Sequence, residues 1–94
     1  QGLDLEALRA LPDEEVAARL LPIRGIGPWT VEMFLIFSLG RPDVVSFGDY
    51  AIRKGMANLY GLKDLDKAKF ARFRKRYVPY GTVASFYLWE AAVV

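Results

Sequence analysis

The side chains of this chain that could do chemistry are carboxylates, hydroxyls and amines. Its 94 residues include no histidine and no cysteine. This composition excludes the usual general base at neutral pH, a Ser/His/Asp triad, a thiolate nucleophile, a thiolate zinc site and a cysteine-ligated iron–sulfur cluster. Any reaction must therefore use the groups that remain, together with backbone N–H and C=O groups.

Asp49 is a carboxylate at the start of a predicted helix. It follows residues 41–48, which contain helix breakers and show no apolar period. It precedes residues 50–60, whose apolar residues have helical spacing and which are followed by Gly61. Asp49 therefore occupies an N-cap position, where a carboxylate accepts backbone N–H groups. Capping is the ordinary role of an aspartate at such a place, so position alone leaves a structural and a catalytic role open.

A second candidate site is the turn at residues 21–27, between two predicted helices. Gly25 and Gly27 leave the backbone bare, and the amides that follow point outward from the start of the next helix, where anions bind. We expect the apolar residues Leu21, Ile23 and Ile26 to pin this turn to both helices. The alternative is a tight helix–helix turn without a ligand.

Charge is distributed unevenly along the chain. The formal net charge is +2, but residues 1–49 hold four basic and eight acidic residues, whereas residues 50–94 hold nine basic and three acidic ones. The densest basic cluster comprises Arg72, Arg74, Lys75 and Arg76. A basic half favours a polyanion as partner, and the alternative is an ordinary solvated helix face.

Apolar periodicity predicts an all-α chain. A short first helix carries Leu3, Leu5 and Leu8 and stops before Pro12. Further helices are predicted at about 13–21, from Pro28 to a stop at Gly40, at 50–60, at 66–77 and after Thr82 as a cap. The longest apolar run, 33–39, is far shorter than the ~20 residues of a membrane span, so we expect a soluble chain.

The spacing also predicts which helical positions are buried. The predicted apolar stripes are Val16, Ala17, Leu20 and Leu21; Val31, Phe34, Leu35 and Leu39; Ile52, Met56 and Leu59; Phe70 and Phe73; and Ala84, Tyr87, Leu88 and Ala91. The chain begins with Gln1 and shows no leader, which suggests a partial chain.

Four strings in order along the chain resemble the helix-hairpin-helix DNA glycosylase superfamily, and within it the 3-methyladenine DNA glycosylase II branch. They are Leu21-Pro22-Ile23-Arg24-Gly25-Ile26-Gly27-Pro28-Trp29-Thr30, Leu39-Gly40-Arg41-Pro42-Asp43, Gly48-Asp49-Tyr50-Ala51-Ile52-Arg53-Lys54, and Pro79-Tyr80-Gly81-Thr82 leading to Tyr87-Leu88-Trp89. The resemblance implies an orthogonal helical bundle that forms the C-terminal half of the family's catalytic domain. Residues 1–94 are then one domain, with the hairpin at about 13–39, the catalytic loop and helix at about 41–61, and a basic and a last helix at about 66–93.

The resemblance gives Asp49 a role. In the family, an aspartate at this position is catalytic, and the physical argument agrees: breaking a glycosidic bond builds positive charge on the sugar, which a carboxylate can stabilise. An alkylated purine carries its own positive charge and leaves without a strong general acid, so histidine is not needed. The expected reaction is hydrolytic release of 3-methyladenine or 7-methylguanine during base-excision repair.

The resemblance also implies the residues that hold the substrate. Trp29, Met33 and Trp89 would line the base pocket, with burial in the core as the alternative for both tryptophans. Bifunctional relatives have a lysine where this chain has Trp29, so we expect no lyase activity. DNA phosphate would be held by the backbone of Gly25, Gly27, Trp29 and Thr30 and by Arg24. A structural K⁺ or Na⁺ would face the carbonyls of Leu21, Ile23 and Ile26, with no required cofactor and no iron–sulfur cluster.

The chain departs from the family pattern in two ways. Gly81 stands where relatives often have arginine, and the N-terminal half of the catalytic domain is absent from this sequence. The expected partners are therefore double-stranded DNA with an alkylated base and the missing half, with self-association of the fragment as a further expectation. The fragment alone is expected to bind DNA weakly or to be inactive. The implied location is the cytoplasm, at the nucleoid in a prokaryote.

Two hypotheses compete with the enzyme. One is a non-catalytic helix-hairpin-helix module that holds the DNA backbone without sequence preference, and it would have no need of Asp49 or the tryptophans. The other is an all-α interaction domain whose basic helix is merely solvated. Release of an alkylated base distinguishes the enzyme from the module, and salt-dependent duplex binding distinguishes both from the interaction domain.

Overall fold

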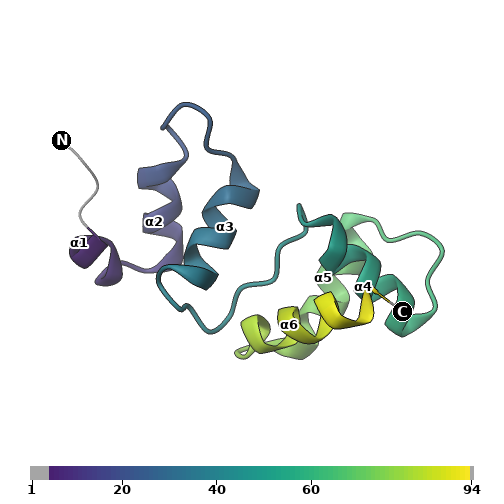
Figure 1. Ribbon diagram of the computed structural model, residues 1–94. Coiled ribbons are helices and arrows are strands. Elements are labelled where there is room, and N and C mark those ends of the chain that lie inside the picture. Colours follow the sequence, from purple (N-terminus) through teal and green to yellow (C-terminus); the bar gives the residue numbers. More distant parts are fainter. Residues whose placement is uncertain (1–4, 94) are drawn as a thin grey trace. The chain divides into compact units, whose positions relative to one another are not determined.

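Capping residues in the sequence determine where several of the helices begin and end. A computed structural model describes residues 5–93, and this part of the chain contains helices and turns but no strand (Figure 1). It divides into two compact units, one ending at Arg41 and the other beginning at Pro42. No helix in the described part is both long enough and apolar enough to cross a bilayer. The all-α prediction is confirmed.

The first unit contains a helical hairpin preceded by a short helix. Its helices are α1 (Leu5–Arg9), α2 (Asp13–Leu20) and α3 (Pro28–Phe37). Its buried apolar side chains are Leu8, Val16, Leu20, Val31, Leu35, Ile36 and Leu39. Arg41 closes the unit, since its guanidinium forms an ion pair with Asp13 at 2.8 Å and donates to the Leu8 carbonyl at 3.1 Å. Leu3, which was expected in the first helix, lies outside the described residues.

The second unit packs three helices and one short 3-10 turn around a single core. They are α4 (Tyr50–Tyr60), α5 (Lys67–Arg74), η1 (Lys75–Tyr77) and α6 (Gly81–Ala91). The core consists of Val45, Ile52, Met56, Phe70 and Leu88. Helices α4 and α6 lie side by side (Figure 1), because Gly55 brings its backbone against that of Leu88.

Asp49, Asp66 and Gly61 begin or end helices as predicted. Asp49 accepts the Ile52 N–H at 3.0 Å at the start of α4, and Asp66 accepts the Lys69 N–H at 2.8 Å at the start of α5. Gly61 ends α4 with φ at +66°, a left-handed conformation that glycine adopts without strain. Helix α5 then continues into η1, where burial and a 2.8 Å hydrogen bond to Tyr60 raise the pKa of Tyr77.

Helix α3 ends earlier than predicted, at Phe37 rather than near Gly40. The chain then turns with Gly40 at φ +62°, and the Arg41 N–H bonds back to the Leu35 carbonyl at 2.9 Å. Leu39 is buried, but from this turn rather than from the helix. In α4, Leu59 is 60% exposed, so the prediction that it is buried with Ile52 and Met56 is wrong.

The predicted face of α6 is only partly right. Leu88 is buried as expected, but Tyr87 is 71% exposed, and Thr82 lies within the helix rather than capping it. The other buried positions of α6 are Gly81, Thr82 and Ser85, and Ala92 is buried just after the helix. Thr82 accepts the Val44 N–H, and Ser85 donates to the Val44 carbonyl. These small polar residues can be buried because the backbone of Val44 supplies their hydrogen-bond partners.

Candidate active site

Asp49 is held by two donors from different helices. Its Oδ2 accepts the Ile52 N–H at 3.0 Å and the indole Nε1–H of Trp89 at 2.7 Å. The start of α4 adds the positive end of the helix dipole. These interactions stabilise negative charge on the carboxylate and fix its orientation. Asp49 is therefore both a helix cap and an oriented, half-buried anion.

Trp89, which was predicted to line the base pocket, holds Asp49 through a hydrogen bond. Its half-buried ring packs against the core of the second unit and tilts against Phe86, with centroids 5.5 Å apart. Its indole N–H anchors Asp49 across forty residues of sequence. No spacing rule connects these two positions, so the contact could not be predicted from the sequence.

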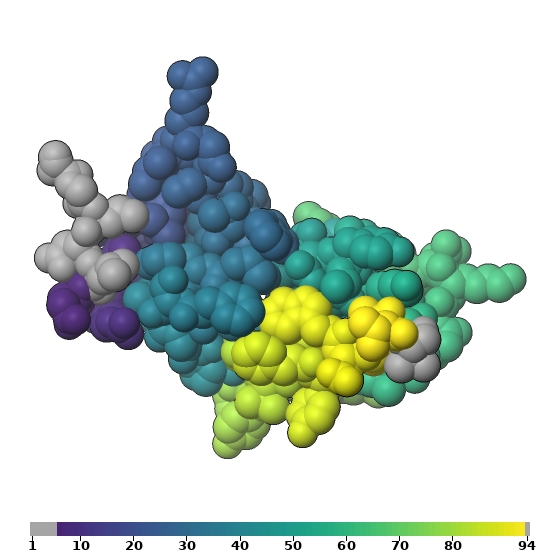
Figure 2. Space-filling view, in the orientation of Figure 1, coloured from purple at the N-terminus to yellow at the C-terminus, as the bar shows by residue number. Residues whose placement is uncertain are grey.

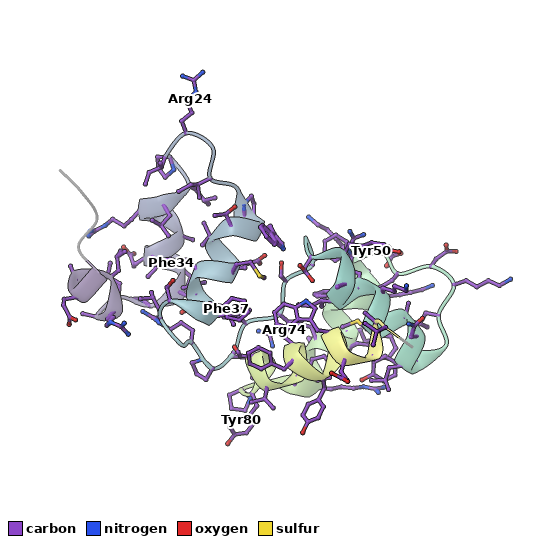
Figure 3. The ribbon with its side chains drawn as sticks, viewed as in Figure 1. Arg24, Phe34, Phe37, Tyr50, Arg74 and Tyr80 are labelled. Atoms are coloured by element: carbon purple, nitrogen blue, oxygen red, sulfur yellow. The ribbon has the colours of Figure 1, made fainter. Side chains whose placement is uncertain are left out.

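Two cations and two aromatic rings surround the start of α4. The Arg53 guanidinium lies 5.3 Å from the Phe47 ring centroid and 5.9 Å from that of Tyr50, and the Lys67 ammonium lies 5.8 Å from the Phe47 centroid. Tyr50 is 68% exposed, next in sequence to Asp49 (Figure 3). Phe47, Tyr50 and Lys67 were not predicted to belong to the site. The signal for the first two was an aromatic residue on either side of Asp49, followed by the basic pair Arg53 and Lys54.

The turn between α2 and α3 projects from the first unit, where it is the blue protrusion in Figure 2. Gly25 takes φ +89°, and Gly27 is the N-cap that precedes Pro28. Arg24 points outward from the tip, as Figure 3 shows. Leu21 and Ile23 are exposed, so the expectation that they pin the turn to both helices is wrong.

The carbonyls expected to face a cation lie in the same turn. The Ile23 carbonyl accepts the Ile26 N–H at 3.1 Å, and the hydrogen bonds described for the first unit give no donor to the carbonyls of Leu21 and Ile26. Carbonyl oxygens with an open lone pair suit a hard cation. The type of donor is therefore compatible with an alkali ion, whose binding here stays a prediction.

Trp29 and Met33 lie four residues apart on α3, on neighbouring turns of one face. Trp29 is 47% exposed and Met33 is half-buried, so Trp29 is not a core residue. The structure thus brings the expected catalytic residue Asp49 and the expected pocket residue Trp89 together in the second unit, and places the pocket residues Trp29 and Met33 together in the first.

The chain was compared with known proteins, and no family model matches it. It is 40% identical over 88 residues to DNA-3-methyladenine glycosylase 1 of Schizosaccharomyces pombe, which covers 93% of the chain. The structure of a DNA-3-methyladenine glycosidase from Bacillus halodurans superposes with a TM-score of 0.84 at 45% identity over 96% of the chain. The chain is homologous to part of the DNA-3-methyladenine glycosylases. The structure of the S. pombe 3-methyladenine DNA glycosylase in complex with abasic DNA, which is 40% identical, superposes with a TM-score of 0.89 over 96% of the chain.

The chain spans between 39% and 44% of the length of these glycosylases. The resemblance to helix-hairpin-helix glycosylases drawn from the sequence motifs is confirmed, and the all-α fold agrees with it.

Gly81, where the resemblance led us to expect arginine, lies in a crowded place at the start of α6. Its N–H donates to Asp43 Oδ1 at 2.9 Å, and Arg74 forms an ion pair with the same oxygen at 2.8 Å. A Cβ at position 81 would lie 2.6 Å from that oxygen, 2.9 Å from Val45 Cγ2 and 3.0 Å from Arg74 Nη1. A side chain at the start of α6 would therefore require the Asp43, Val45 and Arg74 side chains to shift.

Proposed function

We propose that the protein to which this chain belongs is a base-excision repair DNA glycosylase that hydrolyses the N-glycosidic bond of alkylated purines. The observation that carries the proposal is Asp49, a carboxylate oriented by the start of α4 and by Trp89. The proposal is supported by the homology to DNA-3-methyladenine glycosylases, one of them crystallised with abasic DNA. These relatives favour the enzyme over a non-catalytic DNA-binding module.

The role of Asp49 follows from the charge that develops during the reaction. As the glycosidic bond breaks, the sugar becomes oxocarbenium-like, and an ionised carboxylate beside it lowers the energy of that state or orients the attacking water. A 3-methyladenine or 7-methylguanine base is already positively charged, so it departs as a neutral base. Trp29, Met33 and Trp89 would line the pocket for the flipped base, with cation–π attraction of about 0.5–2 kcal/mol.

The hairpin would hold the DNA backbone. The amides of Gly25, Gly27, Trp29 and Thr30 lie at or near the start of α3, where N–H groups lack partners within the helix, and Arg24 is exposed beside them. A K⁺ or Na⁺ held by the carbonyls of Leu21, Ile23 and Ile26 would supply positive charge near a phosphate. No other cofactor is proposed.

The rest of the protein would pack on the outer face of α6. Val83, Phe86 and Tyr87 are exposed there and, with Glu90, line a hollow of about 410 Å³. Because the relatives are more than twice as long as this chain, we propose that a segment outside this sequence covers the hollow. In the isolated fragment, the same apolar face would favour self-association.

The test is a base-release assay with the full-length protein and alkylated duplex DNA. We expect free 3-methyladenine and 7-methylguanine in the supernatant, and intact strands at the resulting abasic sites because Trp29 cannot form a Schiff base. Duplex binding without base release would refute the proposed enzyme. Efficient strand nicking, together with a Schiff-base intermediate that borohydride traps, would refute the monofunctional mechanism.

Replacing Trp89 with phenylalanine tests how Asp49 is oriented. The variant keeps an aromatic ring but loses the N–H that donates to Asp49, and hydrogen bonds to charged groups are worth about 1.5–3 kcal/mol. We expect single-turnover base release to slow about tenfold or more. Tyr80→Phe, at an exposed position just before α6, is the matched control and should react at the wild-type rate. A Trp89→Phe variant with the wild-type rate would show that the indole N–H does not position Asp49.

A further inference from the structure

Arg53 carries a buried donor without an acceptor. Its Nε is inaccessible to water and has no hydrogen-bond partner, and the described ion pairs include none between Arg53 and a carboxylate. Arginine has five N–H donors and is always charged. Leaving a buried donor of a charged group unsatisfied is costly, so native proteins seldom do so without a functional reason.

The Arg53 guanidinium is nevertheless held in a defined position. Its Cζ lies 5.3 Å from the Phe47 ring centroid and 5.9 Å from the Tyr50 ring centroid, and cation–π attraction favours both contacts. Phe47 is itself fixed by an edge-on contact with the buried Phe70, with centroids 5.1 Å apart. Because Nε itself is covered by the protein, the donors that can reach a ligand are the terminal Nη groups, which are not among the buried atoms that lack a partner and which stacking leaves directed away from the rings.

Lys67 adds a second positive charge to the same ring. Its ammonium lies 5.8 Å from the Phe47 centroid, at the first residue of α5. Neither Arg53 nor Lys67 forms an ion pair in the described part of the chain. Two unneutralised cations gathered on one ring repel each other, and a shared anion would remove that repulsion.

The position of Arg53 specifies which anion this is. Arg53 follows the N-cap Asp49 by four residues, one helical turn along α4. If Asp49 acts on the sugar of a flipped nucleotide, the phosphates bonded to that sugar must lie within a few ångströms of the same helix start. A phosphodiester offers oxygens that match the fork of a guanidinium.

We propose that Arg53, stacked on Phe47 and Tyr50, binds a backbone phosphate next to the flipped nucleotide, with Lys67 as a second charge on the same phosphate group. The inference rests on the proposed glycosylase function and adds a DNA-binding residue to it. Arg53 thus ties the backbone to the helix that carries Asp49, and Phe47 is a positioning residue that acts through Arg53.

The test measures how DNA binding depends on salt. Full-length Arg53→Met keeps the apolar stem that packs on Phe47 and loses the charge and the donors. Binding to a duplex with a stable abasic-site analogue is measured by fluorescence anisotropy over a series of salt concentrations. We expect affinity about tenfold weaker at low salt, and a slope of log affinity against log salt that is shallower by about 0.9, the value for one lost phosphate contact.

Two further variants make the result specific. Arg53→Lys should keep most of the salt slope but bind more weakly, because an ammonium cannot make a bidentate contact. Lys63→Met removes an exposed charge just beyond the opposite end of α4 and should leave affinity and slope unchanged. Equal losses in Lys63→Met and Arg53→Met would overturn the proposal, because they would reflect net charge alone.

A purely structural role for Arg53 predicts a different outcome. In that case Arg53→Met would lower the thermal midpoint while keeping the wild-type affinity and salt slope, and this result would overturn the proposal. Base release by the wild-type protein in the same preparation tests the glycosylase function separately. A wild type that releases base, together with an unchanged salt slope in Arg53→Met, refutes the phosphate contact alone.

Discussion

Replacing Asp49 with asparagine in the full-length protein will slow base release by at least about 100-fold, the effect of removing one electrostatic group from a transition state. Asparagine has nearly the same shape and still caps a helix, so the change removes charge while α4 keeps its start. The measurement is the single-turnover rate of 3-methyladenine release, alongside affinity for a duplex with an abasic-site analogue. We expect affinity to be unchanged or tighter, because a negative charge near the phosphates is lost.

Asp66→Asn is the matched control. Asp66 caps α5 by accepting the Lys69 N–H at 2.8 Å, much as Asp49 caps α4, but no second donor orients it among the described contacts. Both variants should lose similarly little stability, and only the Asp49 variant should lose activity. Similar activity in the two variants would reduce Asp49 to a helix cap and remove it from the mechanism.

Replacing Gly55 with alanine will destabilise the second unit by about 3 kcal/mol or more, the upper part of the range for overpacked cores. A Cβ at position 55 would lie 1.8 Å from the Leu88 carbonyl oxygen, and backbone atoms cannot rotate away as a side chain can. The sign of the change in the free energy of unfolding is informative, because in an ordinary helix interior alanine is favoured over glycine by about 1 kcal/mol. The measurement is the free energy of unfolding from urea denaturation.

Gly27→Ala serves as the comparison for that experiment. An added Cβ at position 27 meets no atom within 4 Å, and the φ of −110° suits alanine, so the change should cost less than about 1 kcal/mol. If Gly55→Ala unfolded at the wild-type urea concentration, α4 and α6 would not approach as closely as their packing at Leu88 requires.

Local signals in the sequence were sufficient to predict most helix boundaries. Asp49, Asp66 and Gly61 act within one or two turns of where they stand, so their residue types determine the outcome. Burial was harder to predict, because it depends on what packs against a helix. Tyr87 looks like a core residue by spacing, yet Thr82 and Ser85 are buried instead, since the backbone of Val44 supplies their partners.

The difference between local signals and tertiary packing applies to the site as well. Asp49 could be found from its cap position and its neighbours in sequence. Its bond to Trp89 joins residues forty positions apart, and the stacking of Arg53 on Phe47 depends on how a loop folds back on α4. Such contacts are set by tertiary packing, which the spacing of residues in one chain does not encode.

The carboxylate of Asp43 has a consequence for how this chain can change over evolution. It accepts both the Gly81 N–H and the Arg74 guanidinium, and the space beside position 81 is filled by Arg74 Nη1. A side chain at position 81 and the Arg74 guanidinium therefore compete for space beside Asp43, so we expect the two positions to be epistatic. Gly81→Arg should cost less stability after Arg74→Ala, which frees the Asp43 carboxylate to turn away, than it does alone, although the crowding against Val45 persists in both backgrounds.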